Sequence, residues 1–355
     1  MNMKKHIVLG TLAIFACACE EGIDPVSKVA PGRDETAPVV SIRYPGEGAQ
    51  IRVREDITSV KIELDVKDDI EIGKVVLYLD NAKLKEYSDF KDYRHTVESF
   101  VYDQLTNGDH TIKVEATDLS GKTASATANF SKTAPYKPLY GEMFYMSFDG
   151  DYLDLVSIRE AGKTGSGAFA DGKIGKAYAG ASDSYLTFKT ADIVPALGSE
   201  FSAAFWYKLN TSPDRAGLLT ISPTIDGDAD RKDGIRLFRE GSATSQTIKL
   251  NAGNGSADTW FDGGATAAIA STADWTHIAF TISTTEGVIY LNGEEVSRGA
   301  FSGVSWANCS WISIGSGAPT FTVWNHLSDN SLYDELRLFN KALTQEEVRT
   351  LMDAQ

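Results

Sequence analysis

The sequence predicts an all-β chain made of two successive β-sandwiches, a smaller one followed by a larger one of the jelly-roll type. Short alternating or β-branched runs, separated by turns rich in Gly, Asn and Asp, follow one another over most of the 355 residues. A helical pattern occurs only in the last residues. Two stretches with the composition of flexible tethers, 22–35 and 131–139, divide the chain.

The N-terminus has the pattern of an export signal. Lys4 and Lys5 precede an apolar run over 7–16. That run is too short for a membrane-spanning helix, which needs about 20 residues. Residues 1–18 are therefore predicted to form a cleaved signal peptide.

The end of this leader, "FACACEEG", resembles a bacterial lipoprotein signal, in which a cysteine is acylated and becomes the first residue of the mature protein. Small residues precede both cysteines, and Cys19 is favoured over Cys17 because Glu20 and Glu21 follow it directly. An acidic pair at this place resembles the surface-export signal of Bacteroides-type lipoproteins. The resemblance implies a lipid anchor, a flexible tether over 19–35 and a location on the outer membrane, facing the cell exterior. A secretion signal that releases a soluble protein is the alternative.

Composition limits the function classes. The formal net charge is −15, and loss of Lys4 and Lys5 with the leader leaves 32 basic against 49 acidic residues, or −17. Such a surface repels nucleic acid and anionic lipid headgroups, whereas neutral partners, or partners bridged by calcium, fit it. Only Cys309 lies outside the leader, so no intramolecular disulfide can form in the body and packing must stabilise both domains.

Residues 36–131 are predicted to form the smaller sandwich. The runs "VVSIRYP", "SVKIELDVKD", "KVVLYLD", "HTVESFVYD", "HTIKVEATD" and "SATANF" are each of strand length and are separated by turn signals. The opening "DETAPVVSI" and the closing "LTNGDHTIKVEATDLSGKTASATANF" resemble bacterial immunoglobulin-like domains. A linker is predicted over 132–139.

Residues 140–355 are predicted to form the larger sandwich, with a short C-terminal helix. Thr344 precedes "QEEV" as an N-cap with Glu347 three positions on, as in a capping box. The motifs "FSAAFWYKLN", "WTHIAFTIS", "GVIYLNGEEV", "ISIGSG" and "YDELRLFNKALTQEEV" resemble the laminin-G-like, concanavalin A-like lectin/glucanase fold. This fold occurs in lectins, adhesion modules and enzymes, so function must be argued from a site.

No convincing catalytic constellation is found. Glu63, Asp65 and Asp68 in "IELDVKDD" approximate the carboxylate triplet of laminarinase-type glucanases, and retaining hydrolysis does need two carboxyl groups about 5 Å apart. However, the triplet falls in the smaller domain, where the alternation with aliphatic residues places Glu63 and Asp65 on the face opposite the core. We therefore expect that the protein is not an enzyme.

Asp149 in "FDG" and Asp334 in "YDE" are candidate ligands for Ca²⁺. They belong to terminal segments that such sandwiches commonly pair side by side, and Ca²⁺ takes six to eight oxygen ligands. A structural calcium is frequent in relatives of this fold, whereas a role in shaping turns is the alternative. The acidic segment 226–233 is a second candidate, but it lacks the spacing of an EF-hand and is better interpreted as a solvated loop.

Glycan binding needs an aromatic platform for the apolar face of a sugar and polar groups for its hydroxyls. Trp260, Trp306 and Trp324 lie in loop-like surroundings rich in Gly, Asn and Asp, and Asn325 and His326 follow Trp324. Each tryptophan alone could equally pack in the core. Trp311 alternates with isoleucines and lies either on an exposed sheet face or in the core.

Together these features resemble the surface glycan-binding lipoproteins of gut Bacteroidetes. We expect a non-catalytic, lipid-anchored protein that binds a polysaccharide or oligosaccharide by aromatic stacking, with Ca²⁺ as structural support. Its contact with the membrane would be through the lipid only, and importer or hydrolase components are possible neighbours. The alternative is an adhesion or scaffold lipoprotein that binds a protein partner through a broad apolar patch.

Overall fold

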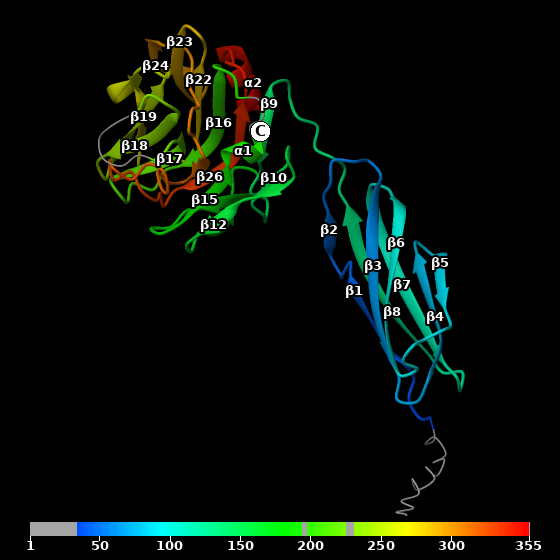
Figure 1. Ribbon diagram of the computed structural model, residues 1–355. Coiled ribbons are helices and arrows are strands. Elements are labelled where there is room, and N and C mark those ends of the chain that lie inside the picture. The colour runs from blue at the N-terminus through cyan, green and yellow to red at the C-terminus, as the bar shows by residue number, and fades with distance from the viewer. Residues whose placement is uncertain (1–33, 194–196, 225–230, 355) are drawn as a thin grey trace, which may run out of the picture. The chain divides into compact units, whose positions relative to one another are not determined.

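The computed structural model describes residues 34–193, 197–224 and 231–354 (Figure 1). The predicted leader, both candidate lipidation sites Cys17 and Cys19, and residues 226–230 of the acidic segment lie outside these ranges. The described chain forms two compact units. The smaller comprises the residues up to Gln50 together with Ser59–Lys132, and the larger comprises Ile51–Thr58 together with the residues from Thr133 on. The regular secondary structure of both units is almost entirely β-strand, which confirms the predicted all-β class.

The smaller unit is an immunoglobulin-like sandwich of two sheets, with strand orders β1-β3-β6 and β2-β8-β7-β4-β5. Its strands are β1 (Val39–Tyr44), β2 (Ala49–Ile51), β3 (Thr58–Lys67), β4 (Ile72–Leu79), β5 (Ala82–Tyr87), β6 (His95–Leu105), β7 (Gly108–Asp118) and β8 (Thr123–Lys132). Alternation along β3 places Ile62, Leu64 and Val66 in the core between the sheets.

The carboxylates of the "IELDVKDD" motif serve structural contacts in this unit. Glu63 pairs with Lys61. Asp65 bonds to Arg43 and, at 3.0 Å, to the His95 Nε2 atom. Asp68 accepts hydrogen bonds from the backbone N–H groups that follow it in the turn. The three side chains stabilise strand pairing and a turn, which is consistent with the placement of Glu63 and Asp65 outside the core.

The larger unit is a sandwich of two sheets with a small additional hairpin. One sheet has the order β12-β15-β25-β17-β18-β19-β20, with β21 paired to β19, and the other has the order β13-β14-β26-β16-β22-β23-β24, with β9 paired to β26. The first sheet consists of β12 (Gly162–Thr164), β15 (Tyr185–Lys189), β17 (Arg215–Ser222), β18 (Ile235–Gly241), β19 (Ser245–Gly253), β20 (Asp258–Asp262), β21 (Ala268–Ala270) and β25 (Trp311–Ile314). The second consists of β9 (Glu142–Met146), β13 (Ala168–Asp171), β14 (Lys176–Ala179), β16 (Phe201–Lys208), β22 (Thr276–Ile282), β23 (Glu286–Leu291), β24 (Glu294–Ala300) and β26 (Leu332–Phe339). The hairpin is β10 (Leu153–Asp154) with β11 (Arg159–Glu160).

The core of the larger unit lies between its two sheets and contains a buried polar network. Asp329 accepts hydrogen bonds from Arg239 (2.6 Å to Nη2), Tyr207 (2.7 Å), Tyr333 (2.6 Å) and Ser331 (2.8 Å). Asp329 and the Arg239 side chain are fully buried. Because every acceptor position of the carboxylate is used, this charge pair is accommodated in the core.

The helix α2 (Gln345–Asp353) begins where the sequence predicted it. Thr344 is its N-cap, and the reciprocal hydrogen bonds between Thr344 and Glu347 form the predicted capping box. Val348 and Leu351 pack on the outer face of the sheet that contains β16, β22 and β23 (Figure 1). Two further helical turns that the sequence did not indicate are α1 (Thr190–Ile193) and the 3₁₀ turn η1 (Gly264–Ala267). None of the helices in the described residues is long and apolar enough to cross a membrane.

Candidate functional site

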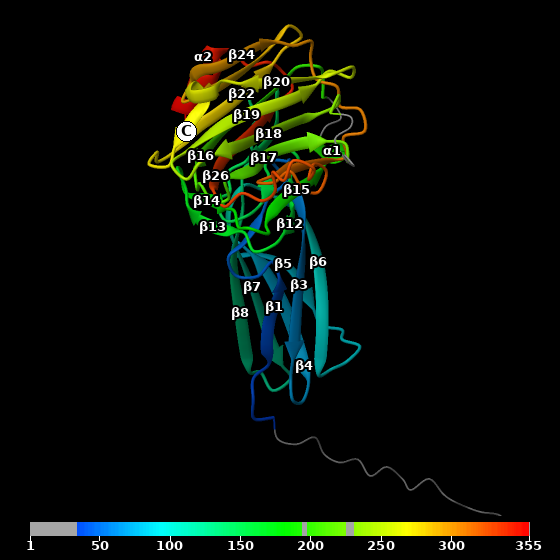
Figure 2. The same cartoon turned by 90° about the vertical axis from the view of Figure 1, so that its left-hand side faces the viewer.

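The candidate site lies on the outer face of the sheet that contains β17, β18, β19 and β20, which run side by side in Figure 2. Alternation along β18 directs Ile235 and Leu237 into the core and Arg236, Phe238 and Glu240 to the outer face. Cross-strand partners share a face, so residues paired in register with the latter three lie there too.

An aromatic cluster is built on this face from residues far apart in the sequence. Trp260 of β20 stacks on Trp324, with ring centroids 4.7 Å apart and an interplanar angle of 25°. Phe238 lies below them, edge-on to Trp260 at 5.8 Å and to Trp324 at 5.9 Å. The ring of His326 lies 4.2 Å from that of Phe238. The structure thus brings together three of the five predicted glycan-binding residues, and Phe238 joins them.

The two tryptophans differ in what they offer a ligand. Trp324 is half-buried: besides Trp260 it contacts the edge of Phe321 at 4.6 Å and the Arg231 guanidinium, which lies 5.0 Å from its ring centroid. Trp260 is 47% exposed and lies on an edge strand. Trp260 is therefore the platform, and Trp324 holds it in place.

Charged and amide side chains flank the platform on both sides. Asp258 accepts from Arg231 Nε (3.2 Å) and from Asn251 Nδ2 (2.7 Å). On the other side Lys249 Nζ lies 2.8 Å from both Glu240 Oε1 and Asp262 Oδ2. Carboxylate, amide, guanidinium and ammonium groups each make more than one hydrogen bond, and sugar hydroxyls can bond to all of them.

The electrostatics of the site keep its groups in single protonation states near neutral pH. Burial alone would raise the pKa values of Glu240 and Asp262, but the hydrogen bonds and charge of Lys249 outweigh it and lower both. The same two carboxylates raise the pKa of Lys249 against its own partial burial. Burial lowers the pKa of His326 to about 4, against the opposing effect of Glu240.

The other predicted glycan contacts lie elsewhere. Asn325 is exposed and is one of the residues that line a neighbouring hollow. Trp306 packs against the core, edge-on to Phe201 at 5.0 Å, and its Nε1–H donates to the Gly198 carbonyl at 2.8 Å. Trp311 lies half-buried on the outer face, since its neighbour Ile312 is in the core. Neither Trp306 nor Trp311 enters the candidate site.

The predicted calcium ligands are brought to one turn of the other sheet. Strand β9, which precedes Asp149, pairs with β26, which contains Asp334. Asp149 Oδ1 accepts from the Lys176 N–H (2.8 Å) and Asp334 Oδ2 from the Ile174 N–H (2.9 Å). The turn between β13 and β14 thus joins both carboxylates.

The geometry around Asp334 leaves one oxygen without a partner. Asp334 is fully buried, burial raises its pKa to about 7, and its Oδ1 atom has no hydrogen-bond donor among the described residues. Gly172 and Gly175 give the two carboxylates room, because a Cβ atom would lie 2.6 Å from Asp334 and 2.0 Å from Asp149 oxygens. Within the described ranges no group of three or more His, Cys, Asp or Glu side chains could hold a metal ion, so further ligands would have to be backbone or water oxygens. The Asp233 carboxylate of the acidic segment accepts instead from the Ser305 hydroxyl, and its backbone carbonyl accepts from Arg236 Nη2.

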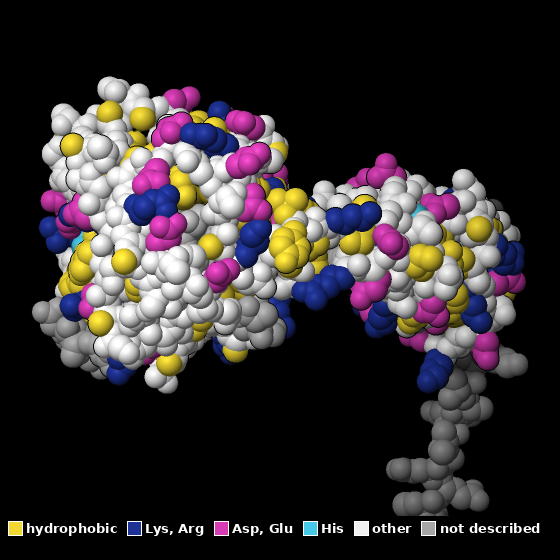
Figure 3. All heavy atoms as spheres, turned by 90° about the horizontal axis from the view of Figure 1, so that it is seen from above, with side chains coloured by type: hydrophobic (Ala, Val, Ile, Leu, Met, Phe, Trp, Pro, Cys, Tyr) yellow, Lys and Arg dark blue, Asp and Glu magenta, His cyan; other side chains and the backbone are white. Residues whose placement is uncertain are grey.

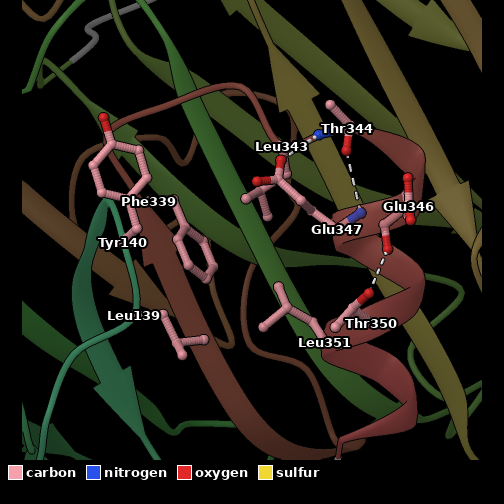
Figure 4. A pocket seen from close by; sticks show the side chains of 9 residues that line it. All are labelled: Leu139, Tyr140, Phe339, Leu343, Thr344, Glu346, Glu347, Thr350 and Leu351. Atoms are coloured by element: carbon pink, nitrogen blue, oxygen red, sulfur yellow. Dashed lines mark hydrogen bonds between the residues drawn. The ribbon is translucent and has the colours of Figure 1, made fainter.

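A second hollow, of about 290 Å³, lies beside α2 (Figure 4). Tyr140 and Phe339 face it from one side, and Leu343 and Leu351 from the helix side. Of the two glutamates that line it, Glu347 is engaged by the capping box and by Lys341 at 2.6 Å. The walls of this hollow are mainly apolar, so it offers a sugar fewer polar partners than the Trp260 face does.

Sequence reasoning missed the residues that support the platform. Phe238, Lys249 and Arg231 lie on strands and a loop whose side-chain pattern resembles ordinary sheet surface. The one available signal was "GIRLFRE", in which polar or charged residues recur on the face opposite Ile235 and Leu237. Alternation could have assigned Phe238 to that polar face. An aromatic side chain there is expected to be buried by other side chains packed on it.

Residues 180–349 match the profile of the concanavalin A-like lectin/glucanases superfamily, and residues 38–114 match that of the bacterial Ig domain. The chain therefore contains a bacterial immunoglobulin-like domain followed by a concanavalin A-like domain, as its motifs predicted. Among curated proteins, none matches this chain.

Several solved structures match part of the chain in fold. Domain 4 of an extracellular arabinanase from Geobacillus stearothermophilus, in complex with arabinotriose, is 25% identical, with 59% of this chain and 97% of that chain covered and a TM-score of 0.46. The binding domains of botulinum neurotoxin serotype C1 and of Paraclostridial Mosquitocidal Protein 1 are each 14% identical, with TM-scores of 0.43 and 0.45. For both, 61% of this chain is covered, and the chain spans about half of their length, 52%. With TM-scores below 0.5, these likenesses carry no functional weight.

Proposed function

We propose that the protein is a non-catalytic, cell-surface carbohydrate-binding lipoprotein that holds a glycan on the outer face of the β17–β20 sheet. The observation that carries this proposal is the exposed Trp260 ring, fixed by Trp324 and Phe238 and flanked by paired polar groups. A fixed aromatic ring binds the apolar face of a sugar without losing conformational freedom of its own. The lectin-like fold fits carbohydrate binding.

The charge around the platform favours a neutral glycan. Arg231 is paired with Asp258, and Lys249 is shared between Glu240 and Asp262. The five charges sum to −1, and the low pKa of His326 leaves it neutral near pH 7. On the face of the larger unit seen in Figure 3, acidic and basic side chains are likewise interspersed. A uronate or sulfate group would meet no unpaired cation among these groups.

The state of the carboxylates on the platform face supports binding without hydrolysis. A glycosidase needs one carboxylic acid whose pKa is raised, so that it can donate a proton to the leaving group. Glu240 and Asp262 share one lysine, which lowers the pKa of each. Asp334 has a raised pKa, but it is fully buried on the other sheet. No described carboxyl group on the platform face has the properties of a general acid.

The test is affinity electrophoresis of the purified protein through gels that contain plant, host or microbial polysaccharides. Retardation by a neutral polysaccharide that is lost in Trp260→Ala, with unchanged unfolding behaviour, supports the proposal. Cleavage products in the gel would contradict the non-catalytic assignment. If a folded protein is retarded by none of the polysaccharides, the alternative of an adhesion or scaffold lipoprotein that binds a protein partner takes its place.

Lipid anchoring at Cys19, or alternatively at Cys17, is part of the proposal and rests on the sequence "FACACEEG". Growth with a labelled fatty acid should label the protein, and Cys19→Ala should abolish the label if that cysteine is acylated, whereas Cys17→Ala should not. Protease treatment of intact cells tests whether the outer-membrane protein faces the exterior. Importer or hydrolase components of a glycan-uptake system are the neighbours that cross-linking should then recover.

A structural Ca²⁺ held by Asp149 and Asp334 is also proposed, because both carboxylates bond to the β13–β14 connection and Asp334 Oδ1 has no donor among the described residues. A hard cation would satisfy that oxygen and tie β9, β26 and the β13–β14 turn together. Calcium should raise the midpoint of thermal unfolding relative to chelator, and Asp334→Asn should remove the difference. An equal midpoint with calcium and with chelator would exclude the ion.

A further inference from the structure

The hollow that Asn325 helps to line, of about 310 Å³, opens at the end of the larger unit where β17 begins. Three loops form it: the turn before β15, the segment between β16 and β17, and the segment between β25 and β26. Its lining includes Ser182, Ser212, Arg215, Asn325, Leu327 and Asn330. We call this hollow the rim pocket.

The rim pocket is lined by polar groups that the protein itself does not satisfy. Among the described residues, the side chains of Ser182, Ser212, Asn325 and Asn330 make no hydrogen bond to the rest of the chain, and the Asn330 Oδ1 atom is buried. A buried carbonyl without a donor is unfavourable, so a donor from outside the protein is favoured there. Hydroxyl groups both donate and accept, which suits this mixture of amides and hydroxyls.

The walls of the rim pocket are fixed by the buried network described above. The Pro213 carbonyl accepts from Arg239 Nη1 at 2.7 Å, and the Asp214 carbonyl accepts from the Gly241 N–H at 2.9 Å. The opposite wall is held by the Leu327 carbonyl, which accepts from the Gly217 N–H at 3.0 Å. A pocket with fixed walls loses little freedom when it binds.

Residues on one face of the sheet connect the rim pocket to the Trp260 platform. Arg215 is the cross-strand partner of Glu240, so both lie on the outer face. Glu240 and Asp262 meet on Lys249, and Asp262 is two residues from Trp260 on the same face of β20. Four residues along β18 and three strand spacings separate Trp260 from Arg215, which is about 20 Å in a regular sheet.

We infer that the ligand is a chain of several neutral sugar rings that spans both places, with one ring stacked on Trp260 and another hydrogen-bonded in the rim pocket. This inference rests on the proposed function. The strip between the two places, Asp262, Lys249 and Glu240, is partly exposed and offers hydrogen-bond partners along the way. A monosaccharide would reach only one of the two places, so affinity depends on chain length.

The experiment is isothermal calorimetry of the whole protein with linear cello-, malto- and arabino-oligosaccharides of two to eight rings. In the series that binds, Kd should fall with each added ring until the chain covers both places and then level off. Asn325→Gly with Asn330→Ala should weaken the longest oligosaccharides about tenfold, and should leave the shortest unchanged. Glycine is chosen because Asn325 has a φ of +59°, which alanine would strain.

The matched control is Asn308→Gly, an exposed asparagine with a φ of +58° outside the rim pocket, which should bind every oligosaccharide like the parent protein. If affinity is the same at all lengths, or if the rim variant binds long chains like the parent, the spanning ligand is wrong. In that case loss of binding in Trp260→Ala still supports the proposed function. If neither the oligosaccharides nor any polysaccharide binds, both are wrong.

Discussion

The two sheets of the larger unit differ in what covers their outer faces. On the sheet with β16 and β22, small residues such as Ala204 and Ala279 admit the helix α2, whose Val348 and Leu351 close the surface. On the sheet with β17–β20, the outer face carries Phe238 under Trp260 and Trp324, together with paired charges. The chain's own helix covers one outer face, whereas aromatic rings that remain in contact with solvent cover the other.

This difference indicates where a ligand can bind. A helix-covered face contributes to stability and offers few free polar groups. The other face is only partly covered by its own chain: Thr320 bonds to Ser222 at 3.1 Å, and the Ala318 carbonyl accepts from Ser313, so the β25–β26 segment fills the part over β17 and β25. The part over β18, β19 and β20 remains for a ligand. Substitutions on the two faces should therefore separate stability from binding.

The largest expected effect is at Asp329, below both faces. Asp329→Ala leaves Arg239 and two tyrosines without their common acceptor in the core, so the free energy of unfolding should fall by about 4 kcal/mol. Urea unfolding measures it. Asp274→Ala, which removes an exposed pair with Lys208, is the control and should cost less than about 1 kcal/mol. Similar losses in both variants would show that the buried network is not what supports the fold.

The stability of the protein should depend on pH through His326, which lies in the aromatic cluster on the outer face of the β17–β20 sheet. Its pKa is about 4 in the folded protein, because burial disfavours the imidazolium, and about 6.5 in the unfolded chain. Between these values only the unfolded chain takes up the proton, so the free energy of unfolding falls as pH drops from about 6.5 to 4, by about 3 kcal/mol. The charged neighbours of His326 are Glu240, which opposes the shift in its pKa, and Arg215 and Lys249, which favour it.

His277, buried on the other sheet, also has a pKa of about 4, so the parent protein alone cannot separate the two histidines. The measurement is urea unfolding at several pH values in the parent and in His326→Gln. The variant should lose less stability than the parent between pH 6.5 and 4. Identical pH profiles would mean that His326 is not held neutral by burial, and that the ligand face is more open than described.

On the helix-covered face, Leu351→Ala should lower the free energy of unfolding by about 2 kcal/mol, since it leaves a cavity under the last turn of α2. Affinity for a polysaccharide should not change, because α2 lies on the sheet opposite the candidate site. Chemical unfolding and affinity electrophoresis on the same preparation test both statements. A loss of retardation in a folded Leu351→Ala protein would contradict the separation of the two faces.

On the uncovered face, Trp260→Ala should have the reverse profile. Removing a central aromatic contact costs about 2 kcal/mol of binding, which weakens affinity about 30-fold. Because Trp260 is half exposed, the free energy of unfolding should change by less than about 1 kcal/mol. Trp306→Ala is the matched control, since Trp306 packs on the core and should cost stability while leaving the platform in place.

The sequence predicted the local elements of the two sheets and the helix better than the packing of residues that are distant in the sequence. Alternation and turn residues are local signals, and they were sufficient for both sandwiches and for the capping box at Thr344. The stacking of Trp260 on Trp324 joins residues from an edge strand and a long loop, which depends on the register of β18, β19 and β20. No local pattern encodes that register.

The sequence also did not reveal which charged side chains are buried. Arg236 and Arg239 sit in one short strand, "GIRLFRE", yet one side chain bonds to Asn251 on the outer face and the other to Asp329 in the core. Both are fully buried, because distant segments supply their acceptors. From sequence alone these residues were indistinguishable from exposed strand arginines, and so the support of the rim pocket could not be predicted.

The smallest expected effect concerns the start of the helix that closes the covered face. Thr344→Ala removes the side-chain acceptor of the Glu347 N–H and should lower the free energy of unfolding by about 1 kcal/mol. Thr344→Ser keeps the hydroxyl and should behave like the parent. Because α2 closes only the sheet with β16 and β22, hydrogen exchange should quicken at β22 and β23 beneath the helix and stay unchanged at β18 and β19. Faster exchange at β18 and β19 would mean that the two faces are coupled through the core, so that a ligand on one could be sensed by the helix on the other.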